Sequence, residues 1–463
     1  MTTTMRAPLG TPRYRFSASR AWLYGAVVAV SLAIMSSVVA ASAAEPGATG
    51  AHVATRLEPG LFALQGFDPA LPPTDLAPLG GIIKYAQYVG LGEPIHTSGG
   101  IYHMKDRIFR YLVQEKGFRA MAIENPWISA DHLQHYLDTC QGSVDDSMTV
   151  SLFGVWQATE VRDLLQWMCQ WNQTHPTDRV ALYGIDIQGQ ALAHAKALFD
   201  FLDQLGLPRT DARFADISLC DGVSATYFPR QHYPQPRYDR CQAALTALQQ
   251  YFNDNQAWIV QHTSSTDLGW ARVHLVGEQH VQEYQLHLLD PYGSPAFMQS
   301  YAARDRGMAY NVRAIHDLRF PYAKTAIWAA NGHVMWQTGE ALHGLDSLGN
   351  HLHSELGSDY AAVLMSAFDV QAHWGALGLC GHVDFADFSN PEIADPIETT
   401  LYNLGAGPLL VRMDRSRPHP AFLDVPHSIG DFWPTLLSDS FSALVYLDVS
   451  PGMHPIGMPS CPP

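Results

Sequence analysis

Carboxylates and histidines follow four short apolar runs of this chain, and these residue types can together transfer protons. The runs cover residues 88–91, 120–123, 180–185 and 325–330, and each has the composition of a buried strand. The polar residues that follow them are Glu93, His96, Glu124, Asp186 and His333. Ligands of open α/β sheets bind beyond the carboxyl ends of the strands, so we expect these side chains to share one pocket. The alternative for each glutamate taken alone is a capping or ion-pair role.

A histidine with carboxylate neighbours is suited to general-base catalysis. Such a base needs a pKa near the working pH, and histidine has one without much tuning. Nearby carboxylates raise the basicity of the imidazole and fix its tautomer. Buried carboxylates are unfavourable unless they have a partner or a task, and several of them at one sheet edge therefore favour a functional pocket.

Segments with helical periodicity separate the apolar runs. Helices are predicted at 104–112, with Gly117 as a typical C-cap, and at 156–171, 191–205, 241–252 and 303–318. Further strands are predicted at 361–368 and 441–447. This alternation predicts an α/β fold with a mixed, mostly parallel central sheet flanked by helices.

The charge balance argues against a nucleic-acid partner. The 463 residues include 28 basic and 44 acidic ones, which gives a formal net charge of -16. Binding to phosphates needs clustered Lys and Arg, and no RNA- or DNA-binding motif is present.

The first residues have the pattern of a secretory signal peptide. Arginines are followed by an apolar segment at 21–41, which ends in the small-x-small pattern Ala41-Ser42-Ala43. We therefore predict a signal peptide at 1–43, a linker-like segment at 44–77, and a periplasmic or extracellular protein with no membrane attachment after cleavage. The alternative is an uncleaved membrane anchor.

Six cysteines follow the predicted cleavage site. An even number in an exported chain favours disulfides, and a local bridge between Cys220 and Cys241 is the first candidate. No C-x-x-C sequence occurs, which argues against a cysteine-based zinc site.

Five ordered motifs extend from about residue 88 to residue 447. They are Gly92-Glu93-Pro94-Ile95-His96 with the segments 105–112 and 115–124 behind it, Trp156/Glu160/Leu165/Trp167/Asn172, Gly184-Ile185-Asp186-Ile187-Gln188, Arg304-Asp305-Arg306-Gly307-Met308-Ala309-Tyr310-Asn311 and Trp328-Ala329-Ala330-Asn331-Gly332-His333-Val334. In this order they resemble the motifs of the erythromycin esterase family. The resemblance implies one hydrolase domain at 78–463.

The resemblance also implies a catalytic site that activates water. The family residue that matches His96 is the favoured general base, and those that match Glu93 and Glu124 hold this base or the water. A cation at Lys105 positions the acidic groups, and His333 matches a second family histidine. We expect hydrolysis of a small-molecule ester or lactone, with no covalent enzyme intermediate and no organic cofactor.

The chain departs from the family pattern at three places. Ala330 stands where the family usually has a histidine, which puts the usual macrolide substrate, or activity itself, in question. Thr97 replaces a usual glycine, and Gly99-Gly100 replace a commonly acidic position.

Three other readings compete with the water-activating hydrolase. A serine hydrolase is disfavoured because Gly222-Val223-Ser224-Ala225-Thr226 lacks the closing glycine of a nucleophile elbow. A metal site is suggested by the crowding of His343, His351, His353 and Glu355. A non-catalytic binding protein on the same fold is the third reading.

Overall fold

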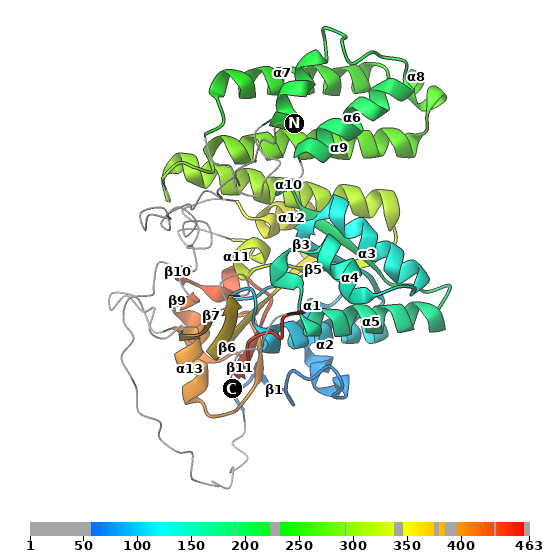
Figure 1. Ribbon diagram of the computed structural model, residues 1–463. Helices are drawn as coiled ribbons and strands as arrows, with labels where there is room; N and C mark the ends of the chain where they lie inside the picture. The colour runs from blue at the N-terminus through cyan, green and yellow to red at the C-terminus, as the bar shows by residue number, and fades with distance from the viewer. Residues whose placement is uncertain are drawn as a thin grey trace, which may run out of the picture. The chain divides into compact units, whose positions relative to one another are not determined.

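The computed structural model describes residues 57–189, 191–222, 232–291, 293–337, 346–374, 379–384, 396–429 and 432–457, which form the coloured ribbon of Figure 1. The predicted signal peptide at 1–43 and the start of the predicted linker lie outside these residues. Of the helices in the described ranges, none combines the length and the apolar character of a membrane span.

Nine strands of the described chain form one sheet. They are β1 (Leu61–Ala63), β2 (Tyr88–Leu91), β3 (Phe118–Pro126), β4 (Ala181–Asp186), β5 (Lys324–Trp328), β6 (Tyr360–Trp374), β7 (Leu379–Asp384), β8 (Leu409–Arg412) and β11 (Ala443–Ser450). The order is β1-β8-β11-β6-β2-β5-β3-β4, with β7 paired to β6. The pairs from β11 to β4 are parallel, whereas the pairs made by β1, β7 and β8 are antiparallel. The predicted mixed, mostly parallel sheet is confirmed. A separate two-stranded sheet joins β9 (His427–Ile429) to β10 (Phe432–Thr435).

The register of the central strands brings the predicted polar residues to one edge of the sheet. Leu91 of β2 and Ile123 of β3 are both paired with Trp328 of β5, so these three strands reach the same level there. Ile123 is also paired with Gly184, which precedes Asp186 by two residues in β4. All residues of β2 and β4 are buried, as expected for parallel strands that are covered on both faces.

The helices match the predicted periodic segments and extend most of them. They are α1 (Ala77–Ile83), α2 (Gly99–Lys116), α3 (Trp127–Thr139), α4 (Val144–Ser151), α5 (Thr159–Thr174), α6 (Ala191–Gln204), α7 (Gln235–Asp254), α8 (Gln256–His262), α9 (Ser265–His287), α10 (Pro295–Arg319), α11 (Asn331–Val334), α12 (Leu348–Leu356) and α13 (Ile397–Asn403). Gly117 ends α2 in the left-handed conformation, with φ of 75°, as its C-cap role predicts. The predicted helix at 156–171 begins later, at Thr159, because Trp156 ends a short 3-10 helix.

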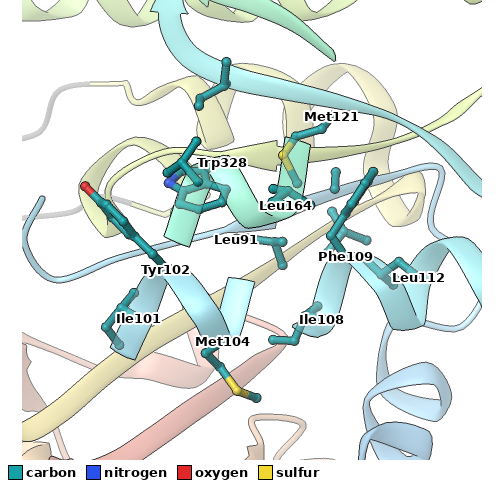
Figure 2. Close-up of a cluster of buried hydrophobic side chains, with 14 of the residues drawn as sticks. Leu91, Ile101, Tyr102, Met104, Ile108, Phe109, Leu112, Met121, Leu164 and Trp328 are labelled. Atoms are coloured by element: carbon teal, nitrogen blue, oxygen red, sulfur yellow. The ribbon is translucent and has the colours of Figure 1, made fainter. Parts of the chain in front are cut away.

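One face of the sheet packs against α2 and α5. Figure 2 shows strand residues Leu91, Met121 and Trp328 among side chains of these helices, which include Ile101, Tyr102, Met104, Ile108, Phe109, Leu112 and Leu164. Burial of each such side chain stabilises the fold by about 1.5–3 kcal/mol relative to leaving that side chain exposed to water. This packing holds α2, and with it Lys105, against the edge where β2 and β5 end.

Helices α6 to α9 have an apolar core of their own. The Cys220–Cys241 disulfide joins the 3-10 helix Ala215–Gly222 to α7, as predicted from the sequence. A second disulfide, Cys140–Cys169, joins the end of α3 to α5. Both disulfides close loops and thereby restrict the unfolded chain.

The segment 57–77, the second part of the linker-like segment in which the first ordered turns were expected, contains two short elements. Leu61–Ala63 forms the edge strand β1 on β8, and Pro73–Leu76 is a 3-10 helix. Arg107 of α2 donates to both carboxylate oxygens of Asp75, at 3.1 and 2.5 Å. A three-residue strand in a Pro- and Gly-rich segment is too short to show the alternation of apolar and polar residues, so it could not be predicted from the sequence.

Candidate active site

Glu93 and His96 lie in the loop between β2 and α2, and their side chains are paired. His96 Nδ1 is 2.5 Å from Glu93 Oε1. The other oxygen of Glu93 accepts hydrogen bonds from Lys105 Nζ at 2.7 Å and Trp328 Nε1 at 3.1 Å. Lys105 also donates to the carbonyl of Ala329 at 3.1 Å. Glu93 and Lys105 are fully buried, so these contacts hold the Glu93 carboxylate in place beside the imidazole of His96.

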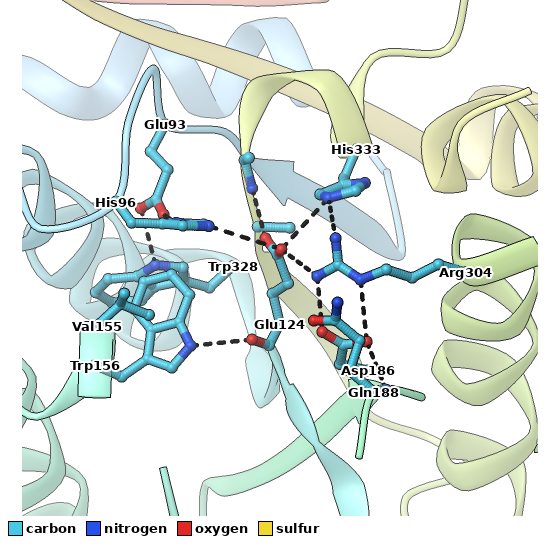
Figure 3. A network of polar contacts seen from close by, with 12 residues as sticks. Glu93, His96, Glu124, Val155, Trp156, Asp186, Gln188, Arg304, Trp328 and His333 are labelled. Carbon is cyan, nitrogen blue, oxygen red and sulfur yellow. Dashed lines mark hydrogen bonds and ion pairs between the residues drawn. The ribbon is translucent and has the colours of Figure 1, made fainter. Parts of the chain in front are cut away.

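Glu124, near the end of β3, is the centre of a second cluster (Figure 3). Its Oε1 accepts a hydrogen bond from Arg304 Nη2 at 2.6 Å and lies 3.3 Å from His333 Nε2, while its Oε2 accepts one from the N–H of Ala330 at 3.0 Å. Arg304 of α10 also donates to Asp186 at 3.1 and 2.7 Å. Burial opposes the charge of Glu124, but His333 and Arg304 hold its pKa well below its usual range.

His333, in α11, lies between two carboxylates. Its Nδ1 is 2.8 Å from Oδ1 of Asp305, and the same oxygen accepts a hydrogen bond from the N–H of Leu348 at 2.8 Å. Burial disfavours a charged imidazole here, but Asp305 and Glu124 outweigh it and raise the pKa of His333 to about 10. This raised pKa favours the cationic imidazole, whereas Nη1 of Arg304, 3.0 Å from Nε2, opposes it. A cation at this position can stabilise negative charge but cannot accept a proton.

The two clusters meet between His96 and Glu124. His96 Nε2 lies 3.9 Å from Glu124 Oε1, which is too far for a direct hydrogen bond. The His96 side chain is 34% exposed, whereas the side chains of Glu93 and Glu124 are almost completely buried. Burial lowers the pKa of His96, but Glu124 and the hydrogen bond to Glu93 more than compensate, so its pKa is raised above 6.5. The His96 side chain is therefore partly within reach of solvent, beside the buried carboxylates.

One aromatic side chain contacts the His96 ring, and further aromatic rings pack against that side chain. Trp156 meets it edge-on, with ring centroids 5.0 Å apart, and donates from Nε1 to the carbonyl of Glu124 at 3.0 Å. The ring centroid of Tyr102 lies 5.5 Å from that of Trp156 and 5.3 Å from that of Trp328. These packed rings limit the directions from which water reaches His96.

The replacement at Ala330 preserves the contact to Glu124. The hydrogen bond comes from the backbone N–H of Ala330, so it does not depend on the side chain at that position.

The replacement at Thr97 has a visible backbone consequence. Thr97 has φ of 72°, a left-handed conformation that favours glycine, and this conformation explains why a glycine is usual there.

Close contacts explain the pair of glycines at 99 and 100. A Cβ on Gly99 would lie 2.7 Å from Oε1 of Glu160 and 2.8 Å from the carbonyl of Gly452. A Cβ on Gly100 would lie 2.6 Å from Oγ of Ser450. The segment after β11 therefore occupies the space that an acidic side chain would need at either position.

The structure brings the five predicted site residues, which are Glu93, His96, Lys105, Glu124 and His333, into one network. It also includes Asp186 and adds two residues that the sequence reasoning did not place in the pocket, namely Arg304 and Asp305. Asp186 was expected at the sheet edge, and the other two belong to a family motif. Only the fold shows that this motif of α10 faces the strand ends. Their catalytic roles remain predictions.

The geometry bears on the alternative readings. Within the described ranges, no three His, Cys, Asp or Glu side chains are grouped so that they could hold a metal ion. His351 and His353 are two residues apart on α12, so they project from different sides of the helix. Glu355 pairs with Arg313 at 3.4 Å. His343 and the stretch 223–226 of the predicted serine motif lie outside the described residues.

Comparison with known proteins identifies the family. The chain matches the erythromycin esterase family over residues 113–449. Glu93, His96 and Lys105 precede this range, whereas Glu124 and His333 lie within it.

Two curated relatives align with parts of the chain. YbfO of Bacillus subtilis (strain 168), which carries the name of a hydrolase, is 23% identical over 269 residues, 57% of this chain and 59% of its own length. Erythromycin esterase type I of Escherichia coli is 26% identical over 160 residues, 32% of this chain and 36% of its own length. The chain thus spans less than two thirds of either relative.

Solved structures share the fold. A Bacillus cereus protein superposes with a TM-score of 0.68 at 19% identity, over 86% of this chain and 96% of its own. A mutant of erythromycin esterase EreC in its open conformation superposes with a TM-score of 0.65 at 19% identity, over 86% and 99%. Since the family match also covers well over half of the 463 residues, this protein belongs to the erythromycin esterase family.

Proposed function

We propose that this protein is an exported hydrolase that cleaves a small-molecule ester or lactone with water activated by His96. One observation carries the proposal: the His96 side chain is 34% exposed, its Nε2 lies 3.9 Å from Glu124, and its Nδ1 is bound to a buried carboxylate. Glu93 fixes the tautomer with the proton on Nδ1 and leaves the lone pair of Nε2 free. Lys105 holds the Glu93 carboxylate in place through its hydrogen bond.

The proposed reaction needs only side chains of this chain and water. Nε2 of His96 takes a proton from water as the oxygen bonds to the carbonyl carbon of the substrate. Arg304 and the protonated form of His333 stabilise the oxyanion of the tetrahedral intermediate. The bond to the leaving oxygen then breaks, and His96 returns its proton to the alkoxide. The products are an acid and an alcohol, or one hydroxy acid from a lactone.

The substrate class rests on the family. One relative is named an erythromycin esterase, so a macrolide lactone, and with it a role in antibiotic resistance, is the first candidate to test. Ala330 removes a side chain that the family usually has at the rim of the site, so we expect a substrate preference different from that of the relatives.

Assays of the purified protein on a panel of esters and lactones test the proposal. We expect turnover by the wild type, no loss with EDTA, and a fall of at least about 100-fold in kcat/KM for His96→Ala, the usual size of a general-base contribution. Equal activity of His96→Ala would refute His96 as the base. Loss of turnover with EDTA would favour a metal mechanism, and binding without turnover would favour the non-catalytic reading.

A further inference from the structure

The last residue of β11 and the residues that follow it cross over the loop that carries His96. We call residues 450–456 the C-terminal strap. An isolated β-bridge pairs Gly452 of the strap with Ser98, and a second one pairs Pro455 with Ala158. One strap thus connects the segment that follows His96 to the segment that follows Trp156, the ring against which His96 packs.

The strap binds Thr97 directly. The carbonyl of Thr97 accepts hydrogen bonds from the N–H of Met453 at 2.9 Å and of His373 at 3.4 Å, and its N–H donates to the hydroxyl of Tyr102 at 2.7 Å. A β-branched residue with φ of 72° is strained, and such a conformation persists only where the surroundings impose it. Because Thr97 follows His96, these bonds hold the backbone next to the residue that carries the imidazole.

The strap also caps helix α2. The N–H of Gly100 donates to the carbonyl of Pro451 at 3.1 Å, and that of Ile101 donates to Oγ of Ser450 at 3.0 Å. The side chain of Ser98 at the N-cap does not cap the helix itself; it pairs with Ser450 instead. The strap therefore satisfies donors that every helix leaves free at its start.

A carboxylate–histidine pair anchors the strap. Glu160 of α5 is 1% exposed, and its Oε1 lies 2.6 Å from His454 Nδ1. The two oxygens of Glu160 also accept from the N–H of His454, at 3.1 and 3.2 Å. The His454 side chain is 55% exposed, so its removal leaves no cavity in the core. Like Glu93 and His96, this is a carboxylate–histidine pair, but it joins α5 to the strap and does not belong to the loop between β2 and α2.

We propose that Glu160 and His454 are positioning residues for His96. They hold the strap, the strap holds Thr97 in its strained conformation, and Thr97 aims the imidazole at Glu124. The catalytic part of this inference rests on the proposed function, whereas the geometric part does not.

A double-mutant cycle between His454→Ala and Thr97→Gly tests the proposal. Glycine adopts the left-handed conformation without strain, so the loop of Thr97→Gly needs less support from the strap. In the Thr97 background we expect His454→Ala to lower kcat about tenfold or more with KM nearly unchanged, because small misplacements of catalytic groups are costly. In the Thr97→Gly background we expect at most a twofold loss. His419→Ala, which removes another histidine paired with a carboxylate (Asp424, 3.0 Å), is the control and should change neither constant.

A spectroscopic arm makes the proposal independent of activity. The imidazole NMR signals of His96, assigned by their loss in His96→Ala, should shift in His454→Ala and return toward their wild-type position in the double variant. Unchanged His96 signals, or an equal loss in both backgrounds, would overturn the proposal. Shifted signals in a protein without turnover would support the positioning role and refute the proposed hydrolysis.

Discussion

The two histidines of the site differ in the arrangement of the carboxylates around them. His333 is enclosed between Asp305 and Glu124, and its pKa is raised to about 10. His96 contacts one carboxylate directly and the second across 3.9 Å, and it remains partly exposed. The partly exposed His96 is the better placed of the two to exchange a proton with water, and we therefore propose proton transfer for His96 and oxyanion stabilisation for His333.

Lys105 should set the alkaline limit of activity. Burial outweighs the attraction of Glu93 and lowers the pKa of Lys105 to about 8. The cation that holds Glu93 is therefore lost as the pH rises through about 8, and kcat/KM should fall there. In Lys105→Arg the guanidinium keeps its charge, so a variant that retains activity should keep kcat/KM level up to about pH 10. Identical alkaline limbs in the two pH profiles would contradict this role.

Arg304 should be necessary for stability as well as for charge. It pairs with Glu124 and Asp186, both buried, and Arg304→Met removes the guanidinium from both carboxylates. We expect a loss of about 3–5 kcal/mol in the free energy of unfolding, measured by urea denaturation. Arg306→Met on the same helix removes a half-exposed pair with Glu283 and should lose less than about 1 kcal/mol. Similar losses for the two variants would argue against the central place of Arg304.

Glu93, His96, Glu124 and His333 were predictable because each follows an apolar run, and strand ends are readable from sequence. Arg304 and Asp305 were not, because helix α10 has polar residues on several sides and only packing decides which of them face the strands. The charge state of His333 depends on that packing too. Sequence therefore indicated the chemistry of the site but not the division of roles within it.

At the scale of elements, the parallel centre of the sheet was readable and its margins were not. Strands β2 to β6 and β11 carry apolar runs long enough to stand out. Strands such as β1 and β9 have three residues each, which is too short for a period to appear. The site lies where the readable strands end, and this explains why its residues could be named from the sequence.

The disulfide between Cys220 and Cys241 should stabilise the helical part formed by α6 to α9. It closes a loop with a sequence separation of 21, which corresponds to about 3 kcal/mol in the chain-entropy model. We expect the double variant Cys220→Ser/Cys241→Ser to lose about this much free energy of unfolding. A loss below about 1 kcal/mol would mean that the loop is already restricted without the bond.

At the scale of the whole molecule, the disulfides and the N-terminal sequence are both consistent with export. Disulfides form and persist in oxidising compartments, and the apolar segment at 21–41 ends in a small-x-small pattern. We predict that protein recovered from the native host begins at Ala44, as intact-mass measurement and N-terminal sequencing would reveal. Recovery of the full-length chain in the membrane fraction would favour the anchor instead.

The central claim is that water, and not a side chain, attacks the substrate. Intact-mass spectrometry of the protein, quenched in acid during turnover of its best ester substrate, tests this claim most directly. The account predicts an unmodified protein mass throughout, together with loss of turnover in His96→Ala. A stoichiometric increase by the mass of the acyl group would contradict it, because that adduct requires a nucleophilic side chain.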